Sequence, residues 1–514
     1  MAEHQPTYTF GVIQRRNVLF GGGAERLVAY AVAGALVGTL ILAKAPFVLV
    51  IFVGVIAAAA VFVPVAGRTA PEWALPLARS TALAPKTAKP FVAPVPSPKA
   101  RSGAPAGRPA SGTSGRALTR PGGARREAEK AAAAPQAREL PPELKGFTWR
   151  SVDDGGIRRG VVVTKGRAGQ TTLTALWRVR GSDRFALADP KDQARLIATW
   201  GGILAATTVE RTRVVDLQWV ERSTPDIGEE QQRWIASHRP AVANERFAAY
   251  EAMALLATTR SVHHDVYVAA KIRTNATKEA TQLAEAMTEW RLIESRLRGA
   301  GFSVAPVSLG QLGGLLRSFC DPVHALLRQA RDGGQMHPKA AGPRARKAGW
   351  DYLQVDGSYQ RYLVVTQWPR LPVPGDWMHP LLVAQAAGVV RCVSMHLRPI
   401  PSSKALRAAT AQRVKTETDL DERAAKGFIV TAARRREVDE VGRREEELTA
   451  GYGEHALACV IGITAASKEE LDQATTSLRQ AAAAARLDVE PLYSYQTEGF
   501  LATLPIAHVA WKGF

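Results

Sequence analysis

The fold is decided by two similar stretches, HDVYVAAKIR at residues 264–273 and HALACVIGIT at residues 455–464. Each is a short apolar run of the kind that forms a buried strand. A helix-start signal follows each run, TKE at residues 277–279 and SKE at residues 467–469, in which a hydroxyl can cap the helix and an acidic side chain lies in its first turn. The sequence therefore predicts a strand followed by a helix at both places.

The similarity continues downstream, because FSVAP at residues 302–306 is echoed by LDVEP at residues 487–491, roughly 190 residues further along. Apolar periodicity also predicts the remaining elements. The expected strands are 161–164, 173–179, 214–220, 266–272, 351–355, 362–367, 390–397 and 456–463, and the expected helices are 192–208, 229–259, 278–298, 404–448 and 468–485.

These elements predict an α/β (α+β) fold in which one unit occurs twice. Each copy should be a split-βαβ-like domain with a mainly antiparallel sheet and long helices. We expect the first domain to span residues 147–335 and the second residues 336–514. The boundary is placed there because glycines, prolines and basic residues gather between 330 and 349.

The N-terminal region contains two uncharged runs, residues 27–43 and 45–67, which only Lys44 separates. A transmembrane helix needs roughly 17–25 apolar residues, so the two runs predict a membrane hairpin with its turn at Lys44 and Pro46. A cleaved signal peptide is the alternative, since AKA at residues 43–45 imitates a cleavage site, but a second apolar run follows at once.

Cationic residues on both sides of the hairpin predict its orientation by the positive-inside rule. Residues 1–26 and everything after residue 67 should then be cytoplasmic, which predicts a multi-pass protein of the cell membrane with both termini inside. The residues that set this expectation are Arg15, Arg16, Arg26, Lys44, Arg68 and Arg79.

Charge is the most unusual feature of the composition, with a formal net charge of +20. Much of it lies in residues 68–146, a basic segment rich in Pro and Ala that cannot bury enough apolar surface to fold alone. We expect a partly extended tether there. Its charge favours an anionic neighbour, either membrane lipid or nucleic acid, although a solvated spacer is the simpler interpretation.

The motif search yields no catalytic signature, because the sequence has no P-loop, GxSxG, HExxH or GxGxxG pattern. The three cysteines, Cys320, Cys392 and Cys459, show no CxxC spacing, which favours buried reduced thiols. DDGG at residues 153–156 reads as a solvated turn and HH at residues 263–264 as a strand start. The chain is therefore expected to be no enzyme and to hold no cofactor or metal.

Five arginines on the predicted helix 404–448 are candidates for contact with an acidic partner. Acidic residues surround them at helical spacing, so a solvated, salt-bridged helix face is the competing interpretation. The candidates are Arg434, Arg435, Arg436, Arg443 and Arg444. Tryptophans interleaved with arginines could stack on nucleic acid bases, but their apolar settings favour core positions for Trp149, Trp177, Trp200, Trp219, Trp234 and Trp290.

Residues 390–505 resemble the N-terminal, non-motor domain of the conjugation-type secretion ATPases, the CagE/TrbE/VirB group. The matching features are the strand 392–397 followed by Arg398-Pro399, the long charged helix, SKEEL at residues 467–471 and the closing run YQTEGFLATLP at residues 495–505. Residues 8–79 are similar to the short PrgI-like two-helix subunit of the same machines. Taken together, and apart from the tether, the chain thus resembles a family of actinobacterial conjugal-transfer membrane proteins.

The resemblance implies a non-enzymatic inner-membrane scaffold of a conjugative or type IV-like secretion apparatus. Such a scaffold would dock a separate motor ATPase, since the chain stops at Phe514 without a motor of its own. Its expected partners are membrane lipid, the ATPase and other apparatus subunits, in a homo-oligomer or a hetero-complex. The alternatives are a subunit of the type VII secretion membrane complex, a membrane-tethered DNA-handling protein, or an enzyme whose site is assembled from dispersed residues.

Overall fold

The computed structural model describes residues 8, 34–35, 38–39, 41–43, 46–62, 76–77, 90–92, 144–166, 170–181, 188–225, 229–240, 244–258, 262–322, 335–383, 388–427 and 431–509. Its strands are β1 (Phe91–Val92), β2 (Phe147–Asp154), β3 (Ile157–Lys165), β4 (Thr171–Arg180), β5 (Val214–Pro225), β6 (Val262–Thr274), β7 (Ser303–Pro306), β8 (Ala345–Ala348), β9 (Leu353–Val355), β10 (Ser358–Gln367), β11 (Val390–Ile400), β12 (Glu454–Ala465) and β13 (Asp488–Pro491).

Its helices are α2 (Phe47–Phe62), α6 (Pro190–Ala205), α7 (Glu229–Ser237), α8 (Glu245–Thr258), α9 (Glu279–Gly299), α10 (Leu309–Cys320), α12 (His379–Val383), α13 (Ser402–Ala425), α14 (Ala432–Thr449), α15 (Lys468–Ala484) and α16 (Gln496–Thr503). The prediction of a mixed α/β fold with a mainly antiparallel sheet is confirmed.

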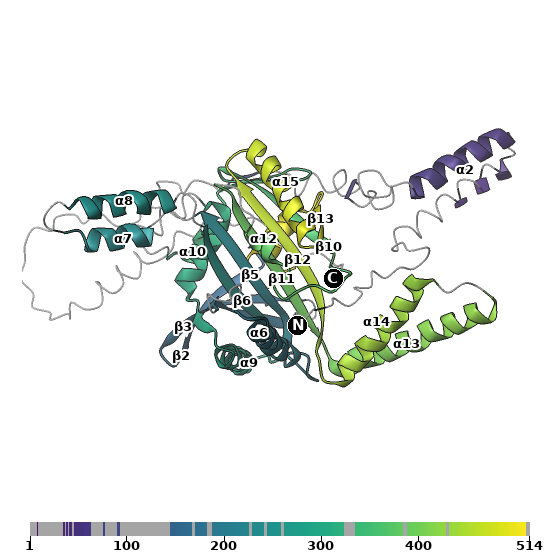
Figure 1. Cartoon of the computed structure of the whole chain (residues 1–514), viewed down its shortest axis with the longest axis horizontal. Coiled ribbons are helices and arrows are strands. Elements are labelled where there is room, and N and C mark those ends of the chain that lie inside the picture. The colour runs from purple at the N-terminus through teal and green to yellow at the C-terminus, as the bar shows by residue number, and fades with distance from the viewer. Residues whose placement is uncertain are drawn as a thin grey trace, which may run out of the picture.

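All the strands in the described residues belong to one 13-stranded antiparallel sheet (Figure 1). Its order is β1-β8-β9-β10-β12-β11-β5-β6-β4-β3-β2, with β13 added to β10 and β7 added to β4. Read outward from the middle, β5-β6-β4-β3-β2 on one side matches β11-β12-β10-β9-β8 on the other. The two halves meet where β5 and β11 pair, with Met395 opposite Trp219.

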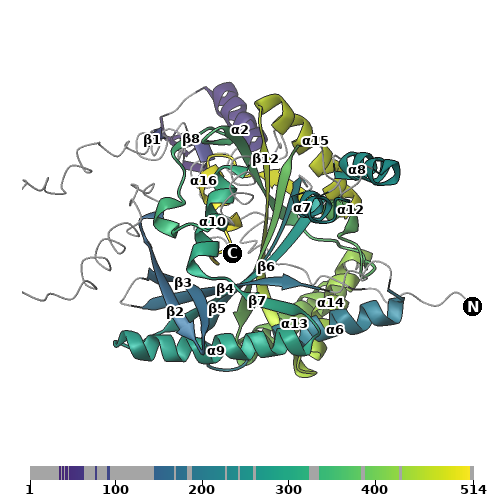
Figure 2. The same cartoon turned by 90° about the vertical axis from the view of Figure 1, so that its left-hand side faces the viewer.

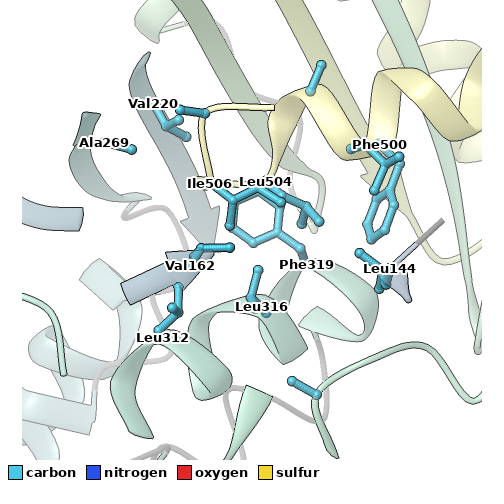
Figure 3. Close-up of a cluster of buried hydrophobic side chains, with 14 of the residues drawn as sticks. Leu144, Val162, Val220, Ala269, Leu312, Leu316, Phe319, Phe500, Leu504 and Ile506 are labelled. Atoms are coloured by element: carbon cyan, nitrogen blue, oxygen red, sulfur yellow. The ribbon is translucent and has the colours of Figure 1, made fainter. Parts of the chain in front are cut away.

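The sheet is covered by helices on both faces. On one face, α9 packs across β4 and β6 in the first half (Figure 2), and α15 packs across β10 and β12 in the second. Trp290 and Leu297 of α9 and Leu471 and Leu478 of α15 supply buried side chains to this core. On the other face, α10 and α16 enclose a separate apolar cluster (Figure 3).

Each half carries a helical hairpin between matching strands, α7–α8 between β5 and β6 and α13–α14 between β11 and β12. Both hairpins extend away from the sheet (Figure 1). A long helix was expected at 229–259 and a long helical stretch at 404–448, and the structure divides each of them into two helices. Pro240 follows α7 closely and cannot donate a helical hydrogen bond, and Gly427 has φ 75°, a backbone conformation that ends a helix.

The expected membrane hairpin is not supported. Within the parts of the chain that the structure describes, none of the helices is both long enough and apolar enough to cross a membrane. The second apolar run forms α2, which has 16 residues and lies between Pro46 and Pro64. At about 1.5 Å per residue such a helix falls short of a core about 30 Å thick.

This finding overturns the predicted transmembrane helices and the predicted multi-pass location in the cell membrane. Most of the first run, residues 27–43, lies outside the described residues. The same is true of every residue that set the predicted orientation, namely Arg15, Arg16, Arg26, Lys44, Arg68 and Arg79.

Parts of the N-terminal region contact the second half of the sheet. Phe91 and Val92, inside the expected tether, form β1 and pair with Arg346 and Ala345 of β8. The hydroxyl of Ser494 donates a hydrogen bond of 3.1 Å to the carbonyl oxygen of Pro76. The segment that was expected to be a partly extended tether therefore extends the sheet at residues 91–92.

Replacing Trp290 by alanine should lower the free energy of unfolding by about 3–5 kcal/mol. The side chain is fully buried between α9 and the sheet, and its Nε1–H donates to the carbonyl oxygen of Ala270 at 3.1 Å. Urea unfolding measures the loss. The matched control is Trp234→Ala, because Trp234 is 47% exposed. Equal losses in the two variants would contradict this account of the core.

Candidate functional site

The five candidate arginines lie on α14, and the structure divides them into two groups. Arg434 pairs with Asp419 and with Glu437, and Arg444 bonds to Glu454 at 2.5 Å. These two side chains thus hold α14 against its neighbours. Arg435, Arg436 and Arg443 are exposed, so they remain the candidates for contact with an acidic partner.

Complementary charge gives α13–α14, here called the charged hairpin, its antiparallel arrangement. The first half of α13 is basic and faces the acidic end of α14, so that Arg413 reaches Glu445 at 2.8 Å. Hydrogen bonds from Thr410 and Arg413 lower the pKa of Glu445. At the other end, acidic Asp419 meets basic Arg434. Exposed ion pairs add little stability, so their main effect is to select this pairing.

The hairpin α7–α8, here called the aromatic hairpin, presents large apolar side chains to solvent. Trp234 stacks on His238 with ring centroids 4.3 Å apart and meets the edge of Tyr250 at 5.7 Å. Tyr250 is 37% exposed and Met253 is 66% exposed. Aromatic residues and methionine are enriched in protein–protein interfaces, which makes this surface a docking candidate.

The prediction that Trp234 belongs to the core is wrong. The adjacent Ile235 is buried instead, and neighbouring residues of one helix cannot both face the same core. The sequence shows that Trp234 and Ile235 are adjacent, and this adjacency indicates that only one of them can face the core. Trp149, Trp177 and Trp290 are buried as expected, whereas Trp200 and Trp219 are half-buried.

The other polar motifs have structural partners. Asp153 accepts the amide of Gly156 at 2.8 Å in the β2–β3 turn, and Asp154 binds Arg159 and Arg291. His264 reaches Glu221 at 2.7 Å from β6. In the described part of the chain, no cluster of three or more His, Cys, Asp or Glu side chains is arranged to bind a metal.

The three cysteines are buried, and their thiols are held in the neutral form. Burial raises the pKa of Cys320 and of Cys459 to about 12, and it raises the pKa of Cys392 further. Because the thiolate is the reactive form, none of these three side chains is an activated nucleophile at neutral pH.

A buried polar network lies where the two halves of the sheet join. His396 Nδ1 is 2.8 Å from Asp216 Oδ2, and Ser394 Oγ is 3.4 Å from His396 Nε2. The order Ser–His–Asp is that of a hydrolase triad, but all three side chains are buried. Ser394 Oγ donates to the carbonyl oxygen of Ala502 at 2.8 Å, so the chain itself occupies the position of a substrate.

Gln218 of β5 fixes residues 502–508, here called the crossing segment, over this network. Its Nε2 donates to the carbonyl oxygens of Ala502 at 3.1 Å and Leu504 at 2.9 Å, and its Oε1 accepts the amide of Ala507 at 2.7 Å. The site was not predicted from the sequence, since its members come from distant strands. The available signal was the run of polar residues on one face of each strand, Asp216 and Gln218 on β5 and Ser394 and His396 on β11.

No protein-family model matches this chain, and no curated protein matches it at a significant level.

Replacing Gln218 by leucine should lower the free energy of unfolding by about 1–3 kcal/mol for each backbone group left unpaired. The Gln218 side chain is fully buried and satisfies two carbonyl groups and one amide of the crossing segment. Gln480→Leu on the exposed face of α15 is the matched control and should change stability little. Urea unfolding of both variants provides the measurement, and an unchanged midpoint for Gln218→Leu would refute the assignment.

Proposed function

We propose that this chain is a non-enzymatic docking scaffold of a conjugative or type IV-like secretion apparatus, which binds a separate motor ATPase. The observation that carries the proposal is the exposed apolar surface of the aromatic hairpin, formed by Trp234, Tyr250 and Met253. Exposed side chains of this kind are costly to keep in water unless a partner covers them.

The matching topology of the two halves supports a duplicated docking unit. We propose that residues 147–335 and 336–514 are two copies of a split-βαβ-like domain, each carrying a helical hairpin at the same place. The shared sheet supplies a stiff base for both hairpins, so little ordering is needed when a partner binds.

The two hairpins would make different contributions to binding. The aromatic hairpin offers an apolar anchor, which typically dominates affinity. The charged hairpin offers exposed Arg435, Arg436 and Arg443 to an acidic surface of the partner, and such contacts mainly speed association and select the partner. The motor ATPase is proposed as that partner because residues 390–505 resemble the non-motor domain of conjugation ATPases.

The test is affinity purification from native cells, with the recovered P-loop ATPases quantified by mass spectrometry. Simultaneous replacement of Trp234, Tyr250 and Met253 by alanine should reduce recovery of a conjugation-type ATPase at least about tenfold. Circular dichroism and the unfolding midpoint should stay unchanged, since the hairpin extends away from the sheet.

Tyr452→Ala is the matched control, because Tyr452 is 66% exposed but lies outside the aromatic hairpin. Its recovery of ATPase should equal that of the unmodified protein. Undiminished recovery by the triple variant, or failure of the unmodified protein to recover any conjugation-type ATPase, would refute the proposal.

A further inference from the structure

The crossing segment is held mainly through its backbone. Carbonyl oxygens at residues 502, 504 and 507 accept hydrogen bonds from side chains on three strands of the sheet. The donors are Gln218 on β5, Ser394 and His396 on β11, and Lys271 on β6, whose Nζ is 3.1 Å from the carbonyl oxygen of Ala507. The segment therefore joins both halves of the sheet at their common centre.

Charged and titratable side chains lie beneath the segment. His396 places Nδ1 at 2.8 Å from Asp216 Oδ2 and Nε2 at 2.9 Å from the carbonyl oxygen of Ala502. Both neighbours are oxygen atoms, so each imidazole nitrogen of His396 lies within hydrogen-bond distance of an oxygen. The remaining nearby charges belong to Lys271 and Arg398, which makes the surroundings of the segment's end positive.

His508 lies at that end. Its ring packs edge-on against Phe147, with centroids 5.1 Å apart, and is half-buried. Burial lowers the pKa of His508 to about 4, with further lowering by the positive charges of Lys271, His396 and Arg398 that Asp216 partly opposes. A docked His508 is thus surrounded by groups that disfavour its protonated form.

We propose that the crossing segment is an acid-sensitive latch, which undocks from the centre of the sheet when His508 takes up a proton. Protonation would add a further positive charge to those of Lys271, His396 and Arg398, with Asp216 as the one opposing charge among these neighbours. Undocking would withdraw Leu504 and Ile506 from the buried apolar cluster that also contains Val220, Ala269 and Phe319 (Figure 3). Acid therefore uncovers an apolar surface at the join of the two halves.

The sign and size of the effect follow from proton linkage. A released His508 binds a proton near its ordinary pKa of 6.5, whereas the docked residue does so only near 4. Docking is therefore fully stable above about pH 6.5 and weakens as the pH falls toward 4. Over that window the equilibrium constant for release should rise by up to about 300-fold, the factor that corresponds to the lowered pKa.

Hydrogen exchange of the Ala507 amide tests the latch, because this amide is bonded to Gln218 Oε1 only while the segment is docked. Protection factors, corrected for intrinsic exchange, are measured from pH 7.5 to pH 4.5, with the buried amide of Ile461 on β12 reporting global unfolding. Protection of Ala507 should fall by at least about tenfold while Ile461 stays protected.

His508→Phe keeps an aromatic ring but removes the titrating group, so it should abolish the pH dependence at Ala507. Should that variant fail to fold, His508→Gln serves the same purpose. His455→Gln is the matched control, since burial also lowers the pKa of His455 to about 4 but its contact is with Thr207, away from the segment. A flat profile in the unmodified protein, or an unchanged fall in His508→Phe, would overturn the proposal.

Discussion

The antiparallel pairing of β5 with β11 is the constraint on which the rest of the structure depends. It converts two sets of strands into one sheet, from Leu217 opposite Leu397 to Ser223 opposite Arg391. Alternate residues on these strands face opposite cores, so Leu217 and Val393 contribute to one face while Val220 and Cys392 contribute to the other. A slip of one residue would exchange the two faces and destroy both cores.

The polar residues at this join explain why the crossing segment must cover it. Gln218, Ser394 and His396 face the α10–α16 side of the sheet, where they would be costly to bury without partners. Backbone groups of residues 502–507 satisfy them. The docked crossing segment therefore supplies the hydrogen-bond partners of the polar residues at the join, and its apolar side chains Leu504 and Ile506 belong to the same buried cluster as Val220 and Cys392.

Single strands and helices could be predicted from the sequence, but the pairing of strands that lie far apart in the chain could not. The strand and helix at 264–299 and at 455–484 were predictable, because apolar runs and cap residues such as Ser467 act over a few positions. The joining of both units in one sheet was not, since strands from separate units pair without a local signal. Mean apolarity also misled at residues 45–67, where helix α2 spans Phe47–Phe62, and at Trp234, whose orientation on its helix is not given by composition.

Hydrogen exchange of the full-length chain in rising denaturant tests most directly whether the β5–β11 pairing makes one cooperative structure. Amides on β4 and β6 report the first half, and amides on β10 and β12 report the second. If the β5–β11 pairing makes one cooperative structure, both sets of amides should lose protection at the same denaturant concentration and with the same dependence on it. Two well-separated transitions would show that the halves unfold independently and would contradict the account.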